Sequence, residues 1–318
     1  DMPFIVLPQK LFAGMNSSSL LAIPFFMLAG NIMSRSITGK LIDVSNALIG
    51  WIKGSLAVVT VLASALFGAI SGSGVATASA VGGTTIPAMK EEGYPDHFAA
   101  AISGIAAILG PIIPPSITLI VYASITDLSV SKLFVGSVIP GILMAVGLII
   151  YALFYGKKND LPAHKRKSAK EVLLIFKDSI WALLMPVIIL GGIFGGIFTP
   201  TESAAVAVVY ALLVSLLIYK DIKIKDIPGI FVDGAISTAT ILLLVGISKS
   251  SGYVITTSGL PHQVLEVFSS FTNSTVVILL LLNILFLVIG MLMEANAAII
   301  MMTPILLPLL DAFGIDPL

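Results

Sequence analysis

The chain has 318 residues, of which 57% are hydrophobic and 11% are charged, and its formal net charge is zero. Its mean hydropathy is +1.08, whereas soluble domains carry about a quarter charged residues. This composition excludes an ordinary soluble domain, and we expect no nucleic-acid partner. The sequence has no cysteine, which excludes disulfides and thiol-ligated metals. We therefore expect an integral membrane protein, surrounded by the lipid bilayer.

Apolar runs long enough to cross about 30 Å of hydrocarbon recur along the chain. They lie at about residues 20–34, 134–156, 180–199, 203–219 and 229–250. The stretches between them lack the aromatic punctuation that is typical of β-barrel strands. The sequence therefore predicts an all-α membrane protein with several spans.

The distribution of lysine and arginine predicts the orientation of these spans. The dense basic run KKNDLPAHKRKSAK at 157–170 places that linker in the cytoplasm by the positive-inside rule. The two following spans cross outward and return, so the next lysines also lie inside: Lys220, Lys223 and Lys225. The amphipathic stretch GKLIDVSNALIGWIKG at 39–54 is predicted to lie as a helix on the same surface.

The segment GAISGSGVATASAVGGTTIP at 68–87 is rich in Gly, Ser and Thr, although it follows an apolar run. If one arm runs inward from Lys53 and the other returns to Lys90, the Ser71–Gly74 stretch forms a turn at mid-membrane. Non-helical backbone at this depth is tolerated only where it is buried in protein or lines a polar cavity. We predict a re-entrant hairpin with both feet in the cytoplasm.

The second half of the chain repeats this plan. The amphipathic stretch 259–271 precedes an apolar hairpin-like segment at 275–318 whose flanking charges are mainly acidic. An offset of 221 pairs Ser73 with Glu294, Ala76 with Ala297, Pro87 with Pro308 and Gly93 with Gly314. The opposite charge bias around the two hairpins predicts repeats that are inverted in the membrane.

A second break in a span lies at 110–116, where Pro111, Pro114 and Pro115 each remove a backbone donor. Two broken elements close together in sequence indicate a transporter binding site. Carbonyls that end a half-helix suit a small hard cation, and amides that begin one suit an anion.

We assign the candidate site residues by this logic. The predicted sodium-binding residues are Ser71, Gly72, Ser73, Gly110, Pro114, Ser116 and Glu294. The predicted substrate-binding residues are Ser73, Gly74, Val75, Ala76, Pro115, Ala295 and Asn296. Sodium is the one expected cofactor, and no catalytic residue is assigned.

Several features also have plain structural readings. Small residues let membrane helices pack closely, and a proline often only kinks a span. Glu202 fits a Thr-x-x-Glu capping box that begins at Thr199. Asp233 and Lys249 lie near span ends, where their side chains reach toward water. The histidines lie at predicted surfaces far apart, which argues against a metal site.

Four motifs together resemble the large membrane subunit of TRAP transporters, the tripartite ATP-independent periplasmic family. They are SGSGVATASAVGGTTIPAMKEEGY, GPIIPPSITLIVYA, GGIFTPTESAAVAVVYAL and MEANAAIIMMTPILLP. The resemblance implies sodium-coupled import of an organic acid across the bacterial inner membrane by an elevator mechanism. It also implies two partners, a small membrane subunit and a periplasmic substrate-binding protein. Family members have further helices at both ends, so we expect this chain to be part of a longer one.

The resemblance implies a division into scaffold and transport parts. Residues 1–54 form a scaffold span and cytoplasmic arm helix, and 55–132 form the transport domain's first hairpin and broken helix. Residues 133–254 form scaffold spans with a cytoplasmic linker at 157–177. Residues 255–274 form the outer arm helix, and 275–318 form the second hairpin.

Three other functions are alternatives to this one. A divalent-anion symporter that works without a binding protein has a related architecture, but its usual Ser-Asn-Thr tips are not matched by Ser-Gly-Ser-Gly. An intramembrane enzyme needs a base near its nucleophile, and no histidine or lysine is expected near Ser71 or Ser116. A passive channel needs a pore open to both sides, which broken hairpins disfavour. The substrate class stays open among sialic acid, other sugar acids and C4-dicarboxylates.

Overall fold

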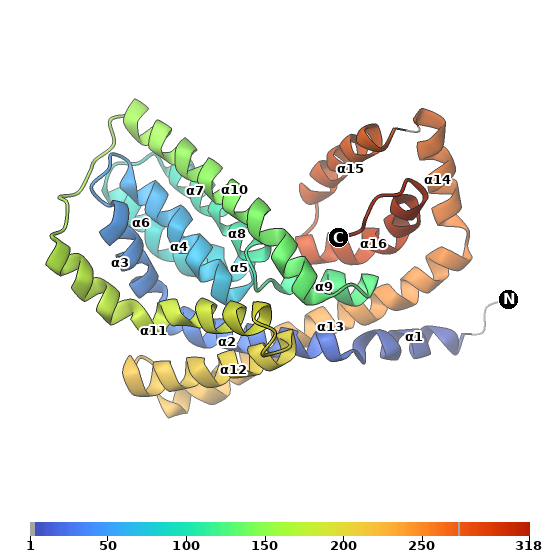
Figure 1. Ribbon diagram of the computed structural model, residues 1–318, viewed down its shortest axis with the longest axis horizontal. Helices are drawn as coiled ribbons and strands as arrows, with labels where there is room; N and C mark the ends of the chain where they lie inside the picture. The colour runs from blue at the N-terminus through green and yellow to red at the C-terminus, as the bar shows by residue number, and fades with distance from the viewer. Residues whose placement is uncertain (1–3, 273) are drawn as a thin grey trace. The chain divides into compact units, whose positions relative to one another are not determined.

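The computed structural model describes residues 4–272 and 274–318, and within them every regular element is a helix (Figure 1). The α-helices are α1 Val6–Met15, α2 Ala22–Ser36, α3 Thr38–Ile49, α4 Ser55–Ser71, α5 Gly74–Thr77, α6 Gly83–Glu91, α7 Asp96–Ala107, α8 Leu109–Ile112, α9 Ile117–Thr126, α10 Val130–Lys158, α11 Ala169–Phe194, α12 Pro200–Leu213, α13 Ile227–Thr257, α14 Leu260–Phe271, α15 Thr275–Gly290 and α16 Ala295–Ala312. Five helices in the described part are long and apolar enough to cross a membrane, or up to 8 spans if each bent pair counts as one. The predicted all-α membrane protein is confirmed.

The five apolar runs fall on α2, α10, α11, α12 and α13, but they missed the beginning of α11. This helix begins at Ala169 rather than near residue 180. Its first turns carry charged side chains that an apolar-run criterion rejects, yet Ser168 and Glu171 form a capping box that starts the helix there. The helix therefore extends beyond the hydrocarbon-length segment.

By packing, the described chain divides into two compact units, and each is described on its own. The larger unit holds residues 22–117 and 134–235, and the smaller holds 1–21, 118–133 and 236–318. These two units are defined by contacts, whereas the predicted scaffold and transport parts are defined by how they move. The division into scaffold and transport parts therefore stays a prediction.

In the larger unit, α4 is the central helix and packs against α2, α3 and α7. Apolar side chains from α4, α7 and α10 form its core, including Val58, Val61, Phe98 and Ile102. The remaining face of α10 is apolar and exposed, at Val135, Ile139, Ile142, Leu143, Val146, Ile150 and Phe154. Such a face suits lipid or another membrane subunit.

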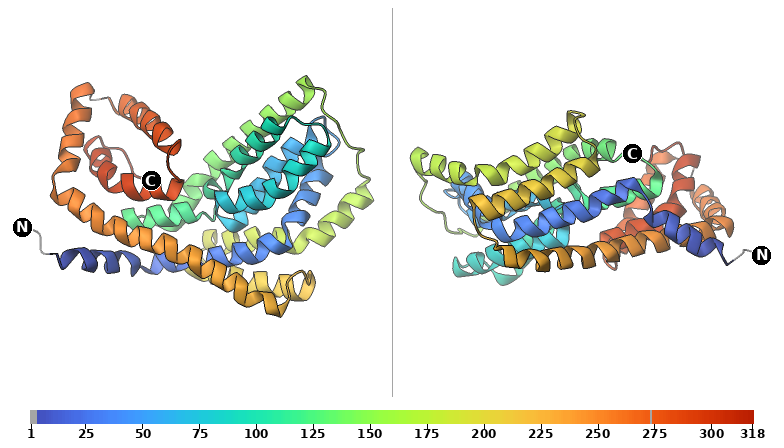
Figure 2. Two further views of the ribbon diagram at one scale, coloured as in Figure 1. Left: turned by 180° about the vertical axis from the view of Figure 1, so that it is seen from behind. Right: turned by 90° about the horizontal axis from the view of Figure 1, so that it is seen from below.

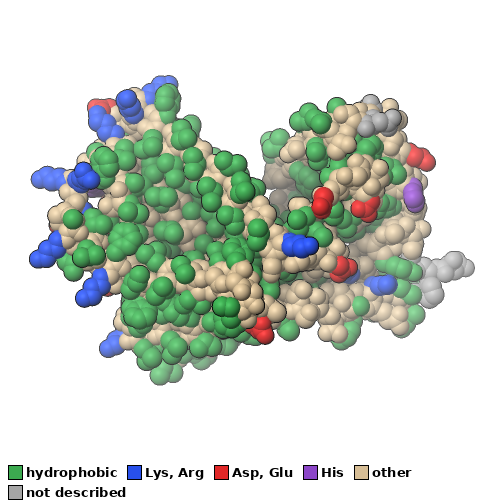
Figure 3. All heavy atoms as spheres, in the orientation of Figure 1, with side chains coloured by type: hydrophobic (Ala, Val, Ile, Leu, Met, Phe, Trp, Pro, Cys, Tyr) green, Lys and Arg blue, Asp and Glu red, His purple; other side chains and the backbone are tan. Residues whose placement is uncertain are grey.

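The apolar side chains cover much of the surface of the larger unit in Figure 3, and lysine and arginine gather at its margin. This margin is where Figure 1 shows the connection between α10 and α11. Lys157 and Lys158 end α10, and the basic linker follows. The segregation of charge agrees with the predicted linker outside the hydrocarbon.

In the smaller unit, α1 runs beside the second part of α13, as Figures 1 and 2 both show. The two helices approach closely because Gly14 has no side chain, and a Cβ there would lie 2.8 Å from the Lys249 Cβ. The helix α14 packs on α16. Ile278, Leu282, Leu306 and Leu309 form the apolar core between α15 and α16.

The paired positions of the predicted repeat have matching local structure. Ser73 and Glu294 are both extended N-cap residues that begin the second helix of a hairpin. Gly93 and Gly314 both have positive φ, at 83° and 64°, where glycine is favoured.

The hydrogen bonds that end the two hairpins also match at the offset of 221. Tyr94 N donates to Met89 O and Ile315 N donates to Leu310 O, both at 2.9 Å. These are the 6→1 bonds of a Schellman motif. Two hairpins with different side chains thus begin and end their second helices in the same way.

Candidate functional site

The first hairpin turns at Gly72 and Ser73. Helix α4 ends at Ser71 because Gly72 adopts a left-handed conformation with φ of 62°, which a residue with a side chain rarely adopts. Ser73 is extended, and its hydroxyl accepts a hydrogen bond from the Ala76 N–H at 3.3 Å. The turn therefore exposes the carbonyl end of one helix and the amide end of the next.

The second break follows α8. The peptide bond between Pro114 and Pro115 is cis, and α9 begins at Ile117. Neither proline donates a backbone hydrogen bond, and the Ser116 hydroxyl donates instead to the Pro111 carbonyl at 2.5 Å. The helix is thus interrupted and partly bridged by a serine side chain.

The hairpin tip and this break lie in direct contact. The Ile117 N–H donates to the Gly72 carbonyl at 3.2 Å. A Cβ at Gly72 would lie 2.6 Å from the Pro115 carbonyl oxygen, and one at Gly110 would lie 2.7 Å from the Ser73 carbonyl oxygen. The structure therefore brings together the two breaks that the sequence predicted as one site.

The contact buries several neutral oxygens. Ser71 is 2% exposed and Ser116 is fully buried. The Ser71 hydroxyl lies 3.5 Å from the Ser73 carbonyl oxygen and 3.4 Å from the Thr77 hydroxyl. Hydroxyl and carbonyl oxygens without a carboxylate suit a monovalent hard cation better than a divalent one. The donor set at this tip therefore fits sodium.

Sequence reasoning missed Thr77. This threonine is fully buried, and its hydroxyl donates to the Ser73 carbonyl at 2.7 Å. A threonine that follows a cap residue by four positions faces back onto it, and this spacing was the signal that could have found it. Thr77 joins Ser71 and Ser116 as a candidate oxygen donor.

The predicted substrate residues at the first tip differ in exposure. Val75 is 72% exposed, Gly74 and Ala76 are half-buried, and Pro115 is buried beside Gly72. The amide side of the tip is therefore more open than the carbonyl side. The geometry leaves the substrate assignment a prediction.

The second tip has a different chemistry. The Glu294 carboxylate caps α16 by accepting from the Asn296 N–H at 2.9 Å and the Ala297 N–H at 3.2 Å. The Asn296 side-chain amide donates to the same carboxylate, while its Oδ1 is buried without a hydrogen-bond partner in the described part of the chain. Ala295 is exposed beside them. An unpaired buried oxygen next to a carboxylate fits a cation.

The foot of the first hairpin, which the sequence predicts to be cytoplasmic, contacts the basic linker. His164 Nε2 lies 2.9 Å from Glu92 Oε1, and the Gly54 N–H donates to the Pro162 carbonyl at 3.1 Å. Burial raises the pKa of the Glu92 carboxyl above its ordinary value, and His164 opposes this shift. The linker therefore packs on the hairpin rather than extending freely.

The plain structural readings of Glu202 and Asp233 agree with the structure, whereas Lys249 donates to the Ile125 carbonyl instead of reaching toward water. Glu202 and Thr199 form the predicted capping box. Asp233 lies 3.4 Å from Arg35, in an exposed ion pair. Among residues 4–272 and 274–318, no group of three or more His, Cys, Asp or Glu side chains is arranged to hold a metal.

Comparison with known proteins decides the family. A family model described as "Tripartite ATP-independent periplasmic transporter, DctM component" matches residues 1–318. The chain belongs to this family. The resemblance carried by the four motifs is therefore confirmed, and the TRAP large permease is a multi-pass membrane protein.

Three relatives illustrate the family. The C4-dicarboxylate TRAP transporter large permease protein DctM of Pseudomonas aeruginosa is 40% identical over 97% of this chain and 73% of its own length. The sialic acid TRAP transporter large permease protein SiaM of Vibrio cholerae is 35% identical over 97% of this chain and 73% of its own length. The isethionate TRAP transporter permease protein DctMQ of Oleidesulfovibrio alaskensis is 36% identical over 100% of this chain and 50% of its own length.

These names have two consequences. The relatives are permeases, which favours transport over the intramembrane enzyme. The names of these relatives state C4-dicarboxylate, sialic acid and isethionate, so membership of the family alone does not fix the substrate.

Proposed function

We propose that this TRAP large permease is the membrane subunit of a sodium-coupled symporter that imports an organic anion across the bacterial inner membrane. The contact between the Ser71–Gly74 tip and the Gly110–Ser116 break carries the proposal. Buried hydroxyls and carbonyl oxygens meet there, and these are the ligands that sodium takes in proteins.

In this proposal, Ser71, Ser73, Thr77 and Ser116 supply oxygens around the ion. The hydroxyls of Ser71, Thr77 and Ser116 donate to backbone carbonyls, and the Ser73 hydroxyl accepts from the Ala76 N–H. Each hydroxyl oxygen has two lone pairs, so each can contact the ion while it keeps its present hydrogen bond. Bound sodium supplies a positive charge beside the tip. The open amides of Gly74 and Val75 then hold the anionic group of the substrate. Ala76, whose N–H donates to the Ser73 hydroxyl, lies beside them and contacts the substrate through its side chain.

A second, separate ion and substrate site is proposed at the second tip, at Glu294, Ala295 and Asn296. The unpaired Asn296 Oδ1 supports a second cation contact there. The two tips are exposed to opposite sides of the membrane in turn as the transport domain moves against the scaffold. A small membrane subunit and a periplasmic substrate-binding protein are the expected partners, and the relative named DctMQ supports a membrane partner.

The test is the thermal stability of the full-length permease with its small subunit, measured across sodium concentrations with choline as the ionic-strength control. Ligand that binds only the folded state adds RT ln(1 + [L]/Kd), about 2.7 kcal/mol at one hundred times Kd. We expect a sodium-specific rise that is reduced in Ser71→Ala and Ser116→Ala.

Ser64→Ala is the matched control. Ser64 is buried on the same helix α4, and its hydroxyl has no hydrogen-bond partner among the described residues. We expect this variant to keep the sodium response. If choline and sodium stabilise the protein equally, or if all three variants lose the sodium response to the same extent, sodium does not bind at this site.

Uptake into proteoliposomes then tests the transport step. We expect substrate uptake to require an inward sodium gradient and the binding protein together. Uptake without the binding protein would support the symporter alternative instead.

A further inference from the structure

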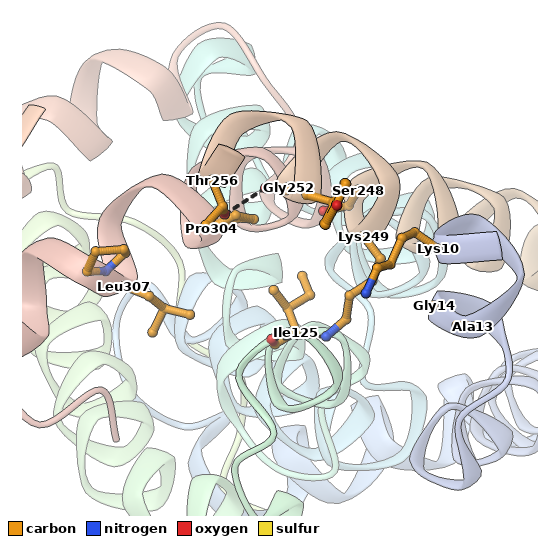
Figure 4. A pocket seen from close by; sticks show the side chains of 12 residues that line it. Lys10, Ala13, Gly14, Ile125, Ser248, Lys249, Gly252, Thr256, Pro304 and Leu307 are labelled. Atoms are coloured by element: carbon orange, nitrogen blue, oxygen red, sulfur yellow. Dashed lines mark hydrogen bonds between the residues drawn. The ribbon is translucent and has the colours of Figure 1, made fainter. Parts of the chain in front are cut away.

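A cavity of about 500 Å³ lies in the smaller unit, lined by residues of α1, α9, α13 and α16 (Figure 4). Its apolar wall includes Pro304 and Leu307, and its polar side chains are Lys10, Ser248, Lys249, Tyr253 and Thr256. The Ser248 hydroxyl is already engaged, because it donates to the Ile300 carbonyl. This volume falls in the range of about 300–1,000 Å³ that is typical of small-molecule sites. None of the lining residues belongs to the sets proposed for sodium or substrate.

Helix geometry places the two lysines on this cavity. On α13, Lys249, Tyr253 and Thr256 lie four and then three positions apart, so they share one face. On α1, Lys10 lies one turn before Gly14, and Gly14 is the point where α1 meets Lys249. Figure 4 shows both lysine side chains entering the pocket from neighbouring helices.

The two ammonium groups are only partly satisfied. The Lys249 ammonium donates to the Ile125 carbonyl at 3.2 Å, which leaves further N–H donors on the same nitrogen. The Lys10 ammonium lies 5.2 Å from the centre of the Tyr253 ring, in a cation–π contact.

None of the described residues that line the cavity is Asp or Glu, and neither lysine forms an ion pair with another described residue. The cavity therefore carries two positive charges without a counter-ion from its own walls.

A purely structural role explains one lysine only. Lys249 meets a carbonyl in the last turn of α9, where a cation is favoured by the helix dipole. Lys10 is exposed and is not needed for that cap. Two lysines on one cavity repel each other, and a shared anion removes the repulsion.

We propose that this cavity binds an oxyanion, a carboxylate, sulfonate or phosphate group, between Lys10 and Lys249. The walls at Pro304 and Leu307 receive the carbon part of the ligand. The proposal does not rest on the transport function, because it uses no residue of the hairpin tips. The oxyanion comes either from a free solute or from a phospholipid headgroup.

The probe for the free solute is inorganic phosphate. We would treat the full-length permease and its small subunit, in maltoside micelles, with an amine-acylating reagent and measure the modification of each lysine by mass spectrometry. Phosphate is compared with chloride at equal ionic strength. We expect protection of Lys10 and Lys249 by about threefold when phosphate is at about twice its Kd.

Lys132 is the internal control, because it is an exposed lysine near the beginning of α10 that does not line the cavity. We expect its modification to be unchanged. A short-chain phosphatidylglycerol, compared with a phosphate-free diacylglycerol of equal chain length, tests the lipid source. Protection by phosphate identifies a free oxyanion site, and protection by phosphatidylglycerol alone identifies a headgroup site.

Variants test the two lysines separately. Lys249→Gln should weaken phosphate binding, read from protection of Lys10, by about tenfold, and Lys132→Gln should leave it unchanged. Lys10→Gln changes only an exposed side chain and should also weaken phosphate binding. In this variant, binding is measured as the protection of Lys249 from the reagent. Equal protection of all three lysines, or protection of neither cavity lysine by either probe, would overturn the proposal.

Discussion

The close contact between the first hairpin tip and the broken helix predicts an unusually large effect for Gly72→Ala. Gly72 has φ of 62°, and a Cβ at this position would lie 2.6 Å from the Pro115 carbonyl oxygen. The substitution therefore imposes two separate costs, one of backbone conformation and one of contact. Gly93→Ala is the matched control, because Gly93 has φ of 83° with no atom within 4 Å of the added Cβ.

The two variants separate these costs. An alanine in the left-handed conformation costs about 1–2 kcal/mol in either variant. Overpacking against backbone costs a further 1–3 kcal/mol or so, and only Gly72→Ala incurs it. We expect a loss of about 2–5 kcal/mol for Gly72→Ala and about 1–2 kcal/mol for Gly93→Ala.

The assay is equilibrium unfolding of the full-length permease in mixed micelles of mild detergent and SDS. The difference between the two variants measures the contact alone. If Gly72→Ala is no more destabilising than Gly93→Ala, the tip does not lie against Pro115, and the proposed sodium site loses its geometry.

Three further predictions concern other parts of the chain. Ser248→Ala should cost about 1–3 kcal/mol in the same unfolding assay. The Ser248 hydroxyl donates at 2.7 Å to the Ile300 carbonyl, and this carbonyl has no donor in its own helix because residue 304 is a proline. A loss no larger than that of the exposed Ser258→Ala would contradict this prediction. Thr199→Ala should cost about 1 kcal/mol, because α12 loses its N-cap, and it should leave substrate uptake unchanged. If the variant is as stable as the parent protein and yet takes up less substrate, the Thr199–Glu202 capping box has a functional role. Burial raises the pKa of the Glu92 carboxyl above its ordinary value of 4.5 in the folded protein, so folding favours the protonated carboxyl. This contribution to the free energy of unfolding should be fully present below about pH 4.5 and should be lost as the pH rises through the raised pKa. Unfolding measured against pH should show this fall in the parent protein and not in Glu92→Gln.

The sequence predicted the two backbone breaks of the first candidate site because their signals are local. A glycine between two serines indicates a turn, and a Pro-Pro pair removes backbone donors wherever it lies. The structure then added that Gly72 and Pro115 touch. The two breaks are predicted from the sequence to form one site because broken elements that lie close together in sequence indicate a binding site. The atomic contact itself depends on tertiary packing, which the sequence pattern does not display.

Other features were missed for physical reasons. Thr77 looked like another small residue of the hairpin, and its role depends on the carbonyl of Ser73 four positions earlier. The start of α11 was missed because charged residues can extend a helix past the hydrocarbon. Lys249 was read as a side chain that reaches toward water, whereas it donates to the Ile125 carbonyl from a distant segment.

The N-caps of the two hairpins have the same backbone role but different charges. A helix that begins at a hairpin tip needs an oxygen to accept its first free N–H groups, and either a hydroxyl or a carboxylate meets this need. Ser73 supplies a neutral oxygen and Glu294 supplies a negative one. The same backbone turn therefore occurs twice in the chain, once with a neutral cap and once with a negatively charged cap, so a single side chain can change the charge at a tip without changing the turn.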